Sequence, residues 1–166
     1  MSLDRLLFVV SNVPWQKVGE RQISPAEARV AMVQAAIAAH PGFELSRVEI
    51  DRGGDSFMAE TLVALQEQNP DSELFLILGA DAAAGIPTWR HAQTLAELAT
   101  LVVLERPGAS EFALHGFRVE RVSMPGLAIS STELRERWRA GRSVDWLIPE
   151  AVQSVLTAWQ LYRGQP

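Results

Sequence analysis

Hydroxyl and arginine side chains gather in one short stretch of this sequence, at Ser130, Ser131, Thr132 and Arg135. The first turn of a helix leaves backbone N–H groups free, and hydroxyl and guanidinium groups donate further hydrogen bonds to anions. The spacing therefore predicts a phosphate-binding cradle at the start of a helix. Ser130 and Glu133 also form the pattern of a capping box, which does no more than begin a helix. The residues alone leave both interpretations open.

A second candidate group follows the apolar run 74–78. Gly79 lets a ligand approach the backbone closely, and Asp81 could accept hydrogen bonds from ribose hydroxyls or serve a metal ion. A plain turn with a helix-capping aspartate uses the same two residues. Trp89 could stack on an aromatic ring or fill the core. Lys17 lies in the loop after the first apolar run, where a phosphate could sit or where the ammonium group is merely solvated.

Composition excludes several other kinds of chemistry. The absence of cysteine excludes disulfides, thiol nucleophiles and metal–thiolate sites, and the three histidines are too far apart in the sequence to form a local metal-binding motif. Fifteen basic against twenty acidic residues leave a net charge of −5, so we expect no nucleic-acid partner. No apolar run approaches the ~20 residues that a membrane helix needs, and residues 1–5 lack the features of a secretory signal. We therefore expect a cytoplasmic protein without membrane contact.

The elements that must position these residues follow an alternating pattern. Short apolar runs alternate with segments of helical period, which predicts an α/β fold with a parallel sheet and helices on both faces. With 166 residues, of which 48% are hydrophobic, we expect one domain over 1–166. Strands are expected at 6–10, 45–50, 74–78, 101–104 and 119–122. Helices are expected at 25–39 with Ser24 as the cap, at 56–68, from about 94, at 131–140 and at 149–161.

Ligands bind beyond the carboxyl ends of the strands in such open sheets. The loops after Val10, Leu78 and Leu104 are therefore the expected place for chemistry.

The sequence motifs together resemble those of a known family. Residues 129–135 (ISSTELR), 141–152 (GRSVDWLIPEAV) and 161–162 resemble the C-terminal signature of bacterial nicotinate-nucleotide adenylyltransferases. The resemblance continues, in order, through residues 14–17, 52–62, 79–81, 87–89 and 106–108, and so covers nearly the whole chain. It implies the nucleotidyltransferase superfamily and a Rossmann-like open parallel sheet.

The resemblance also implies an activity and a role for each candidate residue. Members of the family transfer the AMP part of ATP to nicotinate mononucleotide, giving nicotinate adenine dinucleotide and pyrophosphate for NAD biosynthesis, with Mg²⁺ assisting. By position, the ATP phosphates would contact Ser130, Ser131, Thr132 and Arg135, with Lys17 nearby. The nucleotide sugars would lie beside Gly79 and Asp81, and the nicotinate would be bound by Trp89, Arg90, Phe57 and Met58.

Two departures from the family pattern carry expectations of their own. The family opens with Gly-Gly-x-Phe-Asp-Pro-x-His-x-Gly-His, and Met1 to Leu6 align only with the approach to its second strand. We therefore expect the first strand–helix unit to be missing, because of a late start assignment or a truncation. The catalytic residues stay unknown because the histidine pair belongs to that unit. The first strand would then have an unpaired edge, which allows a homo-oligomer.

The second departure concerns the family's Ser-Tyr-Thr-x-Asp-Thr-Leu segment. Phe57, Met58 and Glu60 stand where that segment has tyrosine, threonine and aspartate. A non-catalytic nucleotide-binding or regulatory paralogue is therefore an alternative function. An adenylyltransferase that acts on another small phosphate ester is a further one.

Overall fold

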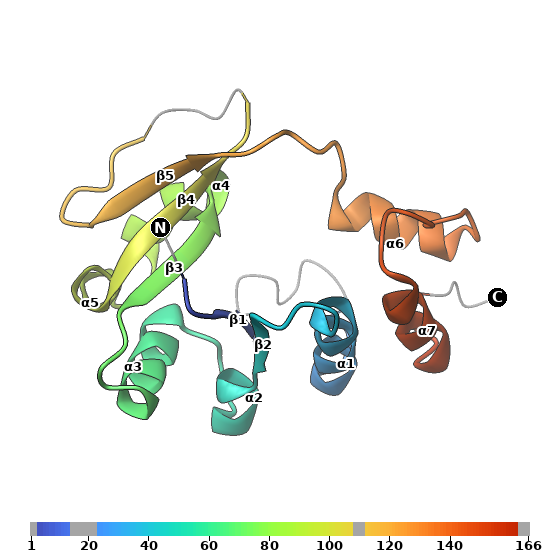
Figure 1. Cartoon of the computed structure of the whole chain (residues 1–166), viewed down its shortest axis with the longest axis horizontal. Helices are drawn as coiled ribbons and strands as arrows, with labels where there is room; N and C mark the ends of the chain where they lie inside the picture. The colour runs from blue at the N-terminus through green and yellow to red at the C-terminus, as the bar shows by residue number, and fades with distance from the viewer. Residues whose placement is uncertain (1–2, 14–22, 108–111, 163–166) are drawn as a thin grey trace. The chain divides into compact units, whose positions relative to one another are not determined.

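The computed structural model describes residues 3–13, 23–107 and 112–162 (Figure 1). The chain divides into two compact units. The first contains residues 1–56 and 128–166, and the second contains residues 57–127. A single domain over 1–166 stays a prediction.

The first unit is built on a strand–helix–strand motif. Strand β1 (Leu6–Val9) runs parallel to β2 (Phe43–Ser46), with Leu6 opposite Phe43 and Val9 opposite Ser46. Helix α1 (Ala26–Ile37) connects the two strands, and the short α2 (Val48–Arg52) follows β2. Such a strand–helix–strand crossover is the unit from which parallel sheets are made.

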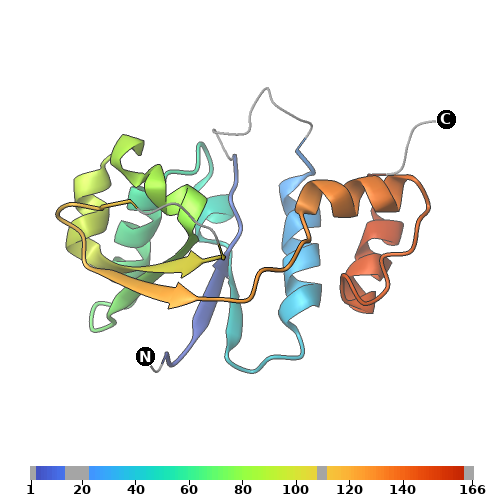
Figure 2. The same ribbon diagram turned by 90° about the horizontal axis from the view of Figure 1, so that it is seen from above.

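Two C-terminal helices, α6 (Ser131–Arg139) and α7 (Glu150–Ala158), complete the first unit. Helix α1 contacts α7, as both views show (Figures 1 and 2). Ala28 of α1 is fully buried there against Leu156 and Leu161. The indole N–H of Trp138 donates to the Leu161 carbonyl at 3.1 Å, so α6 is joined to the turn that follows α7.

The second unit is a three-stranded parallel sheet with the order β3-β4-β5. Its elements are α3 (Met58–Gln68), β3 (Leu74–Gly79), α4 (Ala80–Ala84), the 3₁₀ turn η2 (Ile86–Thr88), α5 (Ala92–Leu98), β4 (Ala99–Glu105) and β5 (Val119–Ser123). Strand β4 lies in the centre and is buried over its first five residues. That burial explains why its sequence is apolar on both faces.

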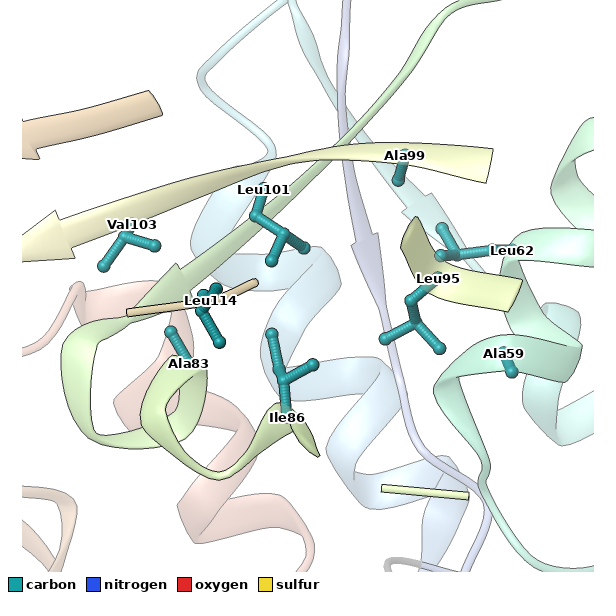
Figure 3. Packing of buried hydrophobic residues seen from close by; sticks show 9 residues of the cluster. All are labelled: Ala59, Leu62, Ala83, Ile86, Leu95, Ala99, Leu101, Val103 and Leu114. Carbon is teal, nitrogen blue, oxygen red and sulfur yellow. The ribbon is translucent and has the colours of Figure 1, made fainter. Parts of the chain in front are cut away.

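The core of the second unit lies on one side of β4 (Figure 3). Leu101 projects from β4 toward Ile86, Val103 projects from the same face of the strand, and Leu95 lies on that side too; all four residues are 0% exposed. The remaining members of this buried cluster are Ala59, Leu62, Ala83, Ala99 and Leu114. The turn that carries Trp89 is thus anchored by Ile86, two residues after the end of α4.

The predicted α/β fold with parallel strands and covering helices is confirmed, but two local predictions are wrong. The predicted strand 45–50 is β2 at Phe43–Ser46, and residues 48–52 form α2 instead. Chain reversal begins at Ser46, whose hydroxyl accepts the Val48 N–H at 3.4 Å. An apolar run as short as this one does not distinguish strand from helix.

The predicted cap of the first helix is the second error. Pro25 precedes α1, and no side chain caps the helix. The Ser24 hydroxyl donates instead to the Tyr162 hydroxyl at 2.7 Å. Glu27, in the first turn of α1, accepts two hydrogen bonds from Arg47 at 2.9 and 2.7 Å. Distant partners brought close by folding displace the local capping contacts.

Candidate functional site

The first turn of α6 carries the hydroxyl groups of the predicted phosphate cradle. Ser130 has extended backbone angles, and its side-chain oxygen accepts the Glu133 N–H at 3.1 Å. The predicted N-cap is therefore confirmed. Ser130, Ser131 and Thr132 are all exposed. The cap uses one backbone N–H group, and the exposed hydroxyls of Ser131 and Thr132 remain at the positive end of the helix dipole.

Arg135 lies one turn along and reaches back toward this helix start. Its guanidinium donates to the Thr132 hydroxyl at 3.2 Å and stands 5.9 Å from the centre of the Tyr162 ring. Arg137, on the same helix, donates twice to the Ser143 carbonyl, at 3.1 and 2.9 Å. Of these two cations, Arg135 is therefore the one that lies beside the exposed hydroxyls.

The second candidate group begins at the carboxyl end of β3. Gly79 ends that strand and precedes α4, and Asp81 lies in the first turn of α4. Both residues are exposed. A Cβ placed on Gly79 would meet nothing within 4 Å, so the space beside this backbone is open. Asp81 is not the residue that caps the helix, so its carboxylate is available to a ligand.

Trp89 and Arg90 follow η2. Trp89 is half-buried and packs against the core of the second unit, as does Met58. The Trp89 ring is thus partly a core residue, and its role in stacking stays a prediction. The Arg90 guanidinium lies 4.7 Å from the centre of the Phe57 ring, and its Nε–H donates to His91 Nε2 at 3.2 Å. Two predicted nicotinate residues, Phe57 and Arg90, are therefore in contact.

The predicted residues fall into separate parts of the molecule. Ser130, Ser131, Thr132 and Arg135 belong to the first unit, and Gly79, Asp81, Phe57, Met58, Trp89 and Arg90 belong to the second. Lys17 lies outside the described residues.

Sequence reasoning missed Arg29, which binds backbone carbonyls at the end of β1. Its Nε donates to the Ser24 carbonyl at 3.1 Å, and its two terminal nitrogens donate to the carbonyls of Ser11 and, at 2.7 Å, of Asn12. Burial lowers the pKa of Arg29, and the neighbouring Tyr162 and Glu49 oppose that change. Because these hydrogen-bond partners are backbone atoms, no motif in the sequence marks them.

Two further features are missing among the described residues. No three His, Asp or Glu side chains within 3–13, 23–107 and 112–162 come close enough together to hold a metal ion. In the same ranges, no helix is both long enough and apolar enough to span a membrane.

Comparison with known proteins shows which family carries these features. Residues 1–137 match the cytidylyltransferase-like family. A protein of Corynebacterium kroppenstedtii named "probable nicotinate-nucleotide adenylyltransferase" is 45% identical over 97% of this chain and 78% of its own length. One of Corynebacterium glutamicum with the same name is 43% identical over 98% of this chain and 77% of its own length. The chain belongs to the nicotinate-nucleotide adenylyltransferase family.

Solved structures support the same fold. The nicotinic acid mononucleotide adenylyltransferase of Plasmodium falciparum, complexed with NaAD, superposes with a TM-score of 0.77. The two sequences are only 16% identical, over 96% of this chain and 83% of the other, so this likeness concerns the fold. The implied family and its Rossmann-like fold are therefore confirmed, and the chain is a transferase by family. Enzymes of this family typically use a divalent metal ion.

Proposed function

We propose that this chain transfers the adenylyl group of ATP to nicotinate mononucleotide, giving nicotinate adenine dinucleotide and pyrophosphate. Two relatives named for this activity are 45% and 43% identical over nearly the whole chain. The observation that carries the proposal is the first turn of α6. There, a capped helix start presents exposed Ser131 and Thr132 hydroxyls beside the Arg135 guanidinium. Such a group suits a polyphosphate.

Reaction at the α-phosphorus places few chemical demands on the protein. A phosphate oxygen of the mononucleotide attacks the α-phosphorus of ATP in line and forms the new bond. The bond from the α-phosphorus to the oxygen that bridges it to the β-phosphorus breaks, and pyrophosphate leaves with the electron pair. Ser131, Thr132 and Arg135 donate hydrogen bonds to the phosphate oxygens and stabilise the charge that develops on the leaving group. Mg²⁺ bound to ATP would neutralise part of the phosphate charge.

Residues of the second unit suit the acceptor nucleotide. The half-buried Trp89 offers an aromatic surface to the nicotinate ring, and the backbone N–H of Arg90 can donate to its carboxylate. The Arg90 guanidinium contacts the Phe57 ring and donates a hydrogen bond to the His91 ring. These two contacts restrain the chain after Trp89. The open backbone at Gly79 and the exposed Asp81 carboxylate suit the sugar hydroxyls.

A second candidate function is nucleotide binding without turnover, as in a regulatory paralogue. Phe57 and Met58 carry no hydroxyl, so this segment offers fewer donors to a bound acceptor than the family's tyrosine and threonine would. Glu60 also places its carboxylate one methylene farther out than aspartate does. These substitutions favour binding with reduced catalysis.

Pyrophosphate release by the 166-residue chain, with nicotinate mononucleotide, ATP and Mg²⁺, separates the two functions. Calorimetric titration with each nucleotide runs in parallel. Release with both substrates present, and none with either alone, is the expected result. Binding of both nucleotides without release would favour the regulatory alternative, and no binding of either would refute both functions.

Arg135→Ala tests which group binds ATP. Loss of a charge-assisted contact worth roughly 1.5–3 kcal/mol should raise the ATP dissociation constant by about tenfold or more. The matched control is Arg139→Ala, which removes an exposed arginine from the last turn of the same helix. Its ATP affinity should stay close to that of the wild type. An equal loss in the two variants would mean that only the net charge of α6 matters.

A further inference from the structure

The chain that leaves β1 is bonded on both sides over residues 11–13. On one side, the Ser11 and Asn12 carbonyls accept hydrogen bonds from the two terminal nitrogens of Arg29. On the other side, the Asn12 N–H donates to the Ser56 hydroxyl at 2.9 Å, and the Asn12 side-chain amide donates to the Gly54 carbonyl at 2.9 Å. The Ser56 N–H in turn donates to the Val13 carbonyl at 3.0 Å. Asn12 thus connects Arg29 with the turn at residues 53–56.

Arg29 is suited to fix backbone rather than side chains. Its guanidinium is a rigid planar fork, and here it donates hydrogen bonds to three backbone carbonyls, those of Ser24, Ser11 and Asn12. Two segments, the one before α1 and the one after β1, are therefore joined by a single group. Lysine keeps the charge but lacks the fork, so it cannot reproduce this arrangement.

The surroundings of Arg29 strengthen these bonds. The Arg29 side chain is half-buried. Glu49 of α2 is only 2% exposed, and its carboxylate lies close enough to favour the charged guanidinium. Hydrogen bonds from a cation are stronger where water is partly excluded. Arg29 therefore restrains the end of β1 more firmly than an exposed arginine would.

The turn at residues 53–56 needs such a restraint. Gly53 and Gly54 have φ angles of +74° and +70°, in the left-handed region that glycine adopts freely. Two consecutive glycines leave the turn with little conformational preference of its own. The bonds from Asn12 to Gly54 and Ser56 supply what the local sequence does not. Ser56 directly precedes Phe57 and Met58, the residues proposed for the acceptor nucleotide.

We infer that Arg29 is a positioning residue for the acceptor: it fixes the Ser11 and Asn12 carbonyls, and Asn12 then holds Ser56, the residue that directly precedes Phe57 and Met58. The inference rests on the proposed function. It assigns Arg29 no contact with substrate and no part in the chemical step. The expected defect is therefore in the binding of nicotinate mononucleotide and not in that of ATP.

Kinetics of Arg29→Lys test this assignment. We expect the KM for nicotinate mononucleotide to rise by about five- to tenfold, with the KM for ATP changed by less than about twofold. Arg47→Lys is the matched control, since it makes the same change at another half-buried arginine of the first unit, whose partners are the Glu27 and Asp51 carboxylates, and it should move neither constant. A variant that is only less stable would lose kcat in proportion to its unfolded fraction and keep both KM values. That outcome, or an equal rise in both KM values, would overturn the inference.

Asn12→Ala tests the path from Arg29 to the turn. It removes the bond to the Gly54 carbonyl while Arg29 and its backbone partners remain. The acceptor KM should rise as in Arg29→Lys. In the double variant, the rise in acceptor KM should stay below the product of the two single rises. An unchanged acceptor KM in Asn12→Ala would overturn the role of Asn12.

Hydrogen exchange gives a readout that does not depend on turnover. The amides of Asn12 and Ser56, which donate to the Ser56 hydroxyl and the Val13 carbonyl, should exchange about tenfold faster in Arg29→Lys than in wild type or Arg47→Lys. Unchanged exchange would refute the positioning role. If the wild-type chain releases no pyrophosphate, the proposed function fails. The amide exchange rates and the dissociation constant for nicotinate mononucleotide would then still test the inference.

Discussion

Ser130 can be substituted so that its two roles, capping α6 and contacting phosphate, are measured separately. Its side-chain oxygen accepts the Glu133 N–H at 3.1 Å, which is the capping contact. Ser130→Ala removes the cap and the hydroxyl together. Ser130→Asp keeps an acceptor that caps as well as serine does, but it adds a negative charge at the proposed phosphate site.

The expected magnitudes follow from the packing of α6. None of its nine residues is buried, so little core packing compensates for a lost cap. We expect Ser130→Ala to lower the free energy of unfolding by about 1 kcal/mol, or about 2–4 °C in Tm for a chain of this size. Ser130→Asp should stay within ~0.5 kcal/mol of the wild type. Like charges 4 Å apart repel by up to ~4 kcal/mol near a protein surface, so Asp should weaken ATP binding by about tenfold or more.

Urea unfolding and calorimetric ATP titration provide the two measurements. The expected pattern is a crossed one, in which Ala lowers stability more than Asp does and Asp lowers ATP affinity more than Ala does. If Ser130→Asp binds ATP as the wild type does, the first turn of α6 is only a helix start and the phosphate assignment is refuted. A stable Ser130→Ala variant would show instead that the hydroxyl contributes nothing as a cap.

Three further predictions concern other residues. Trp89→Ala should raise the KM for nicotinate mononucleotide more than that for ATP in steady-state kinetics, because the proposed stacking contact is lost; equal rises would contradict stacking. Arg47 lowers the pKa of Glu27 through its side-chain hydrogen bonds, so this contact stabilises the fold above the ordinary carboxyl pKa of about 4.3 and is lost as the pH falls through the lowered value. Glu27→Gln should therefore lower Tm slightly at pH 7, and this difference should shrink as the pH is lowered below the ordinary carboxyl pKa; a difference in Tm that does not change with pH would assign it to something other than charge. Tyr162→Phe should lower the free energy of unfolding in urea by about 0.5–1.5 kcal/mol through loss of the bond from Ser24, and the double variant with Ser24→Ala should cost less than the sum of the two single variants. Strict additivity would mean that the two hydroxyls do not interact.

Local signals in the sequence determined much of this protein. The parallel α/β class follows from the alternation of apolar runs with helical segments, and the buried central strand β4 follows from its unbroken apolar residues. The start of α6 at Ser131 follows from a cap and its N–H partner that stand only three residues apart. Such features are predictable because both partners lie within one turn of each other in the chain.

Tertiary structure decided the contacts whose partners are far apart in the sequence. Ser24 had the local pattern of a cap, yet its hydroxyl bonds to Tyr162, 138 residues away. Trp89 was equally suited to core or ligand, and packing against the second unit's core left it half-buried. Arg29 could not be singled out because its partners are backbone carbonyls, which every residue carries. A side-chain donor takes the best acceptor that folding brings within reach, and only the folded chain determines which acceptor that is.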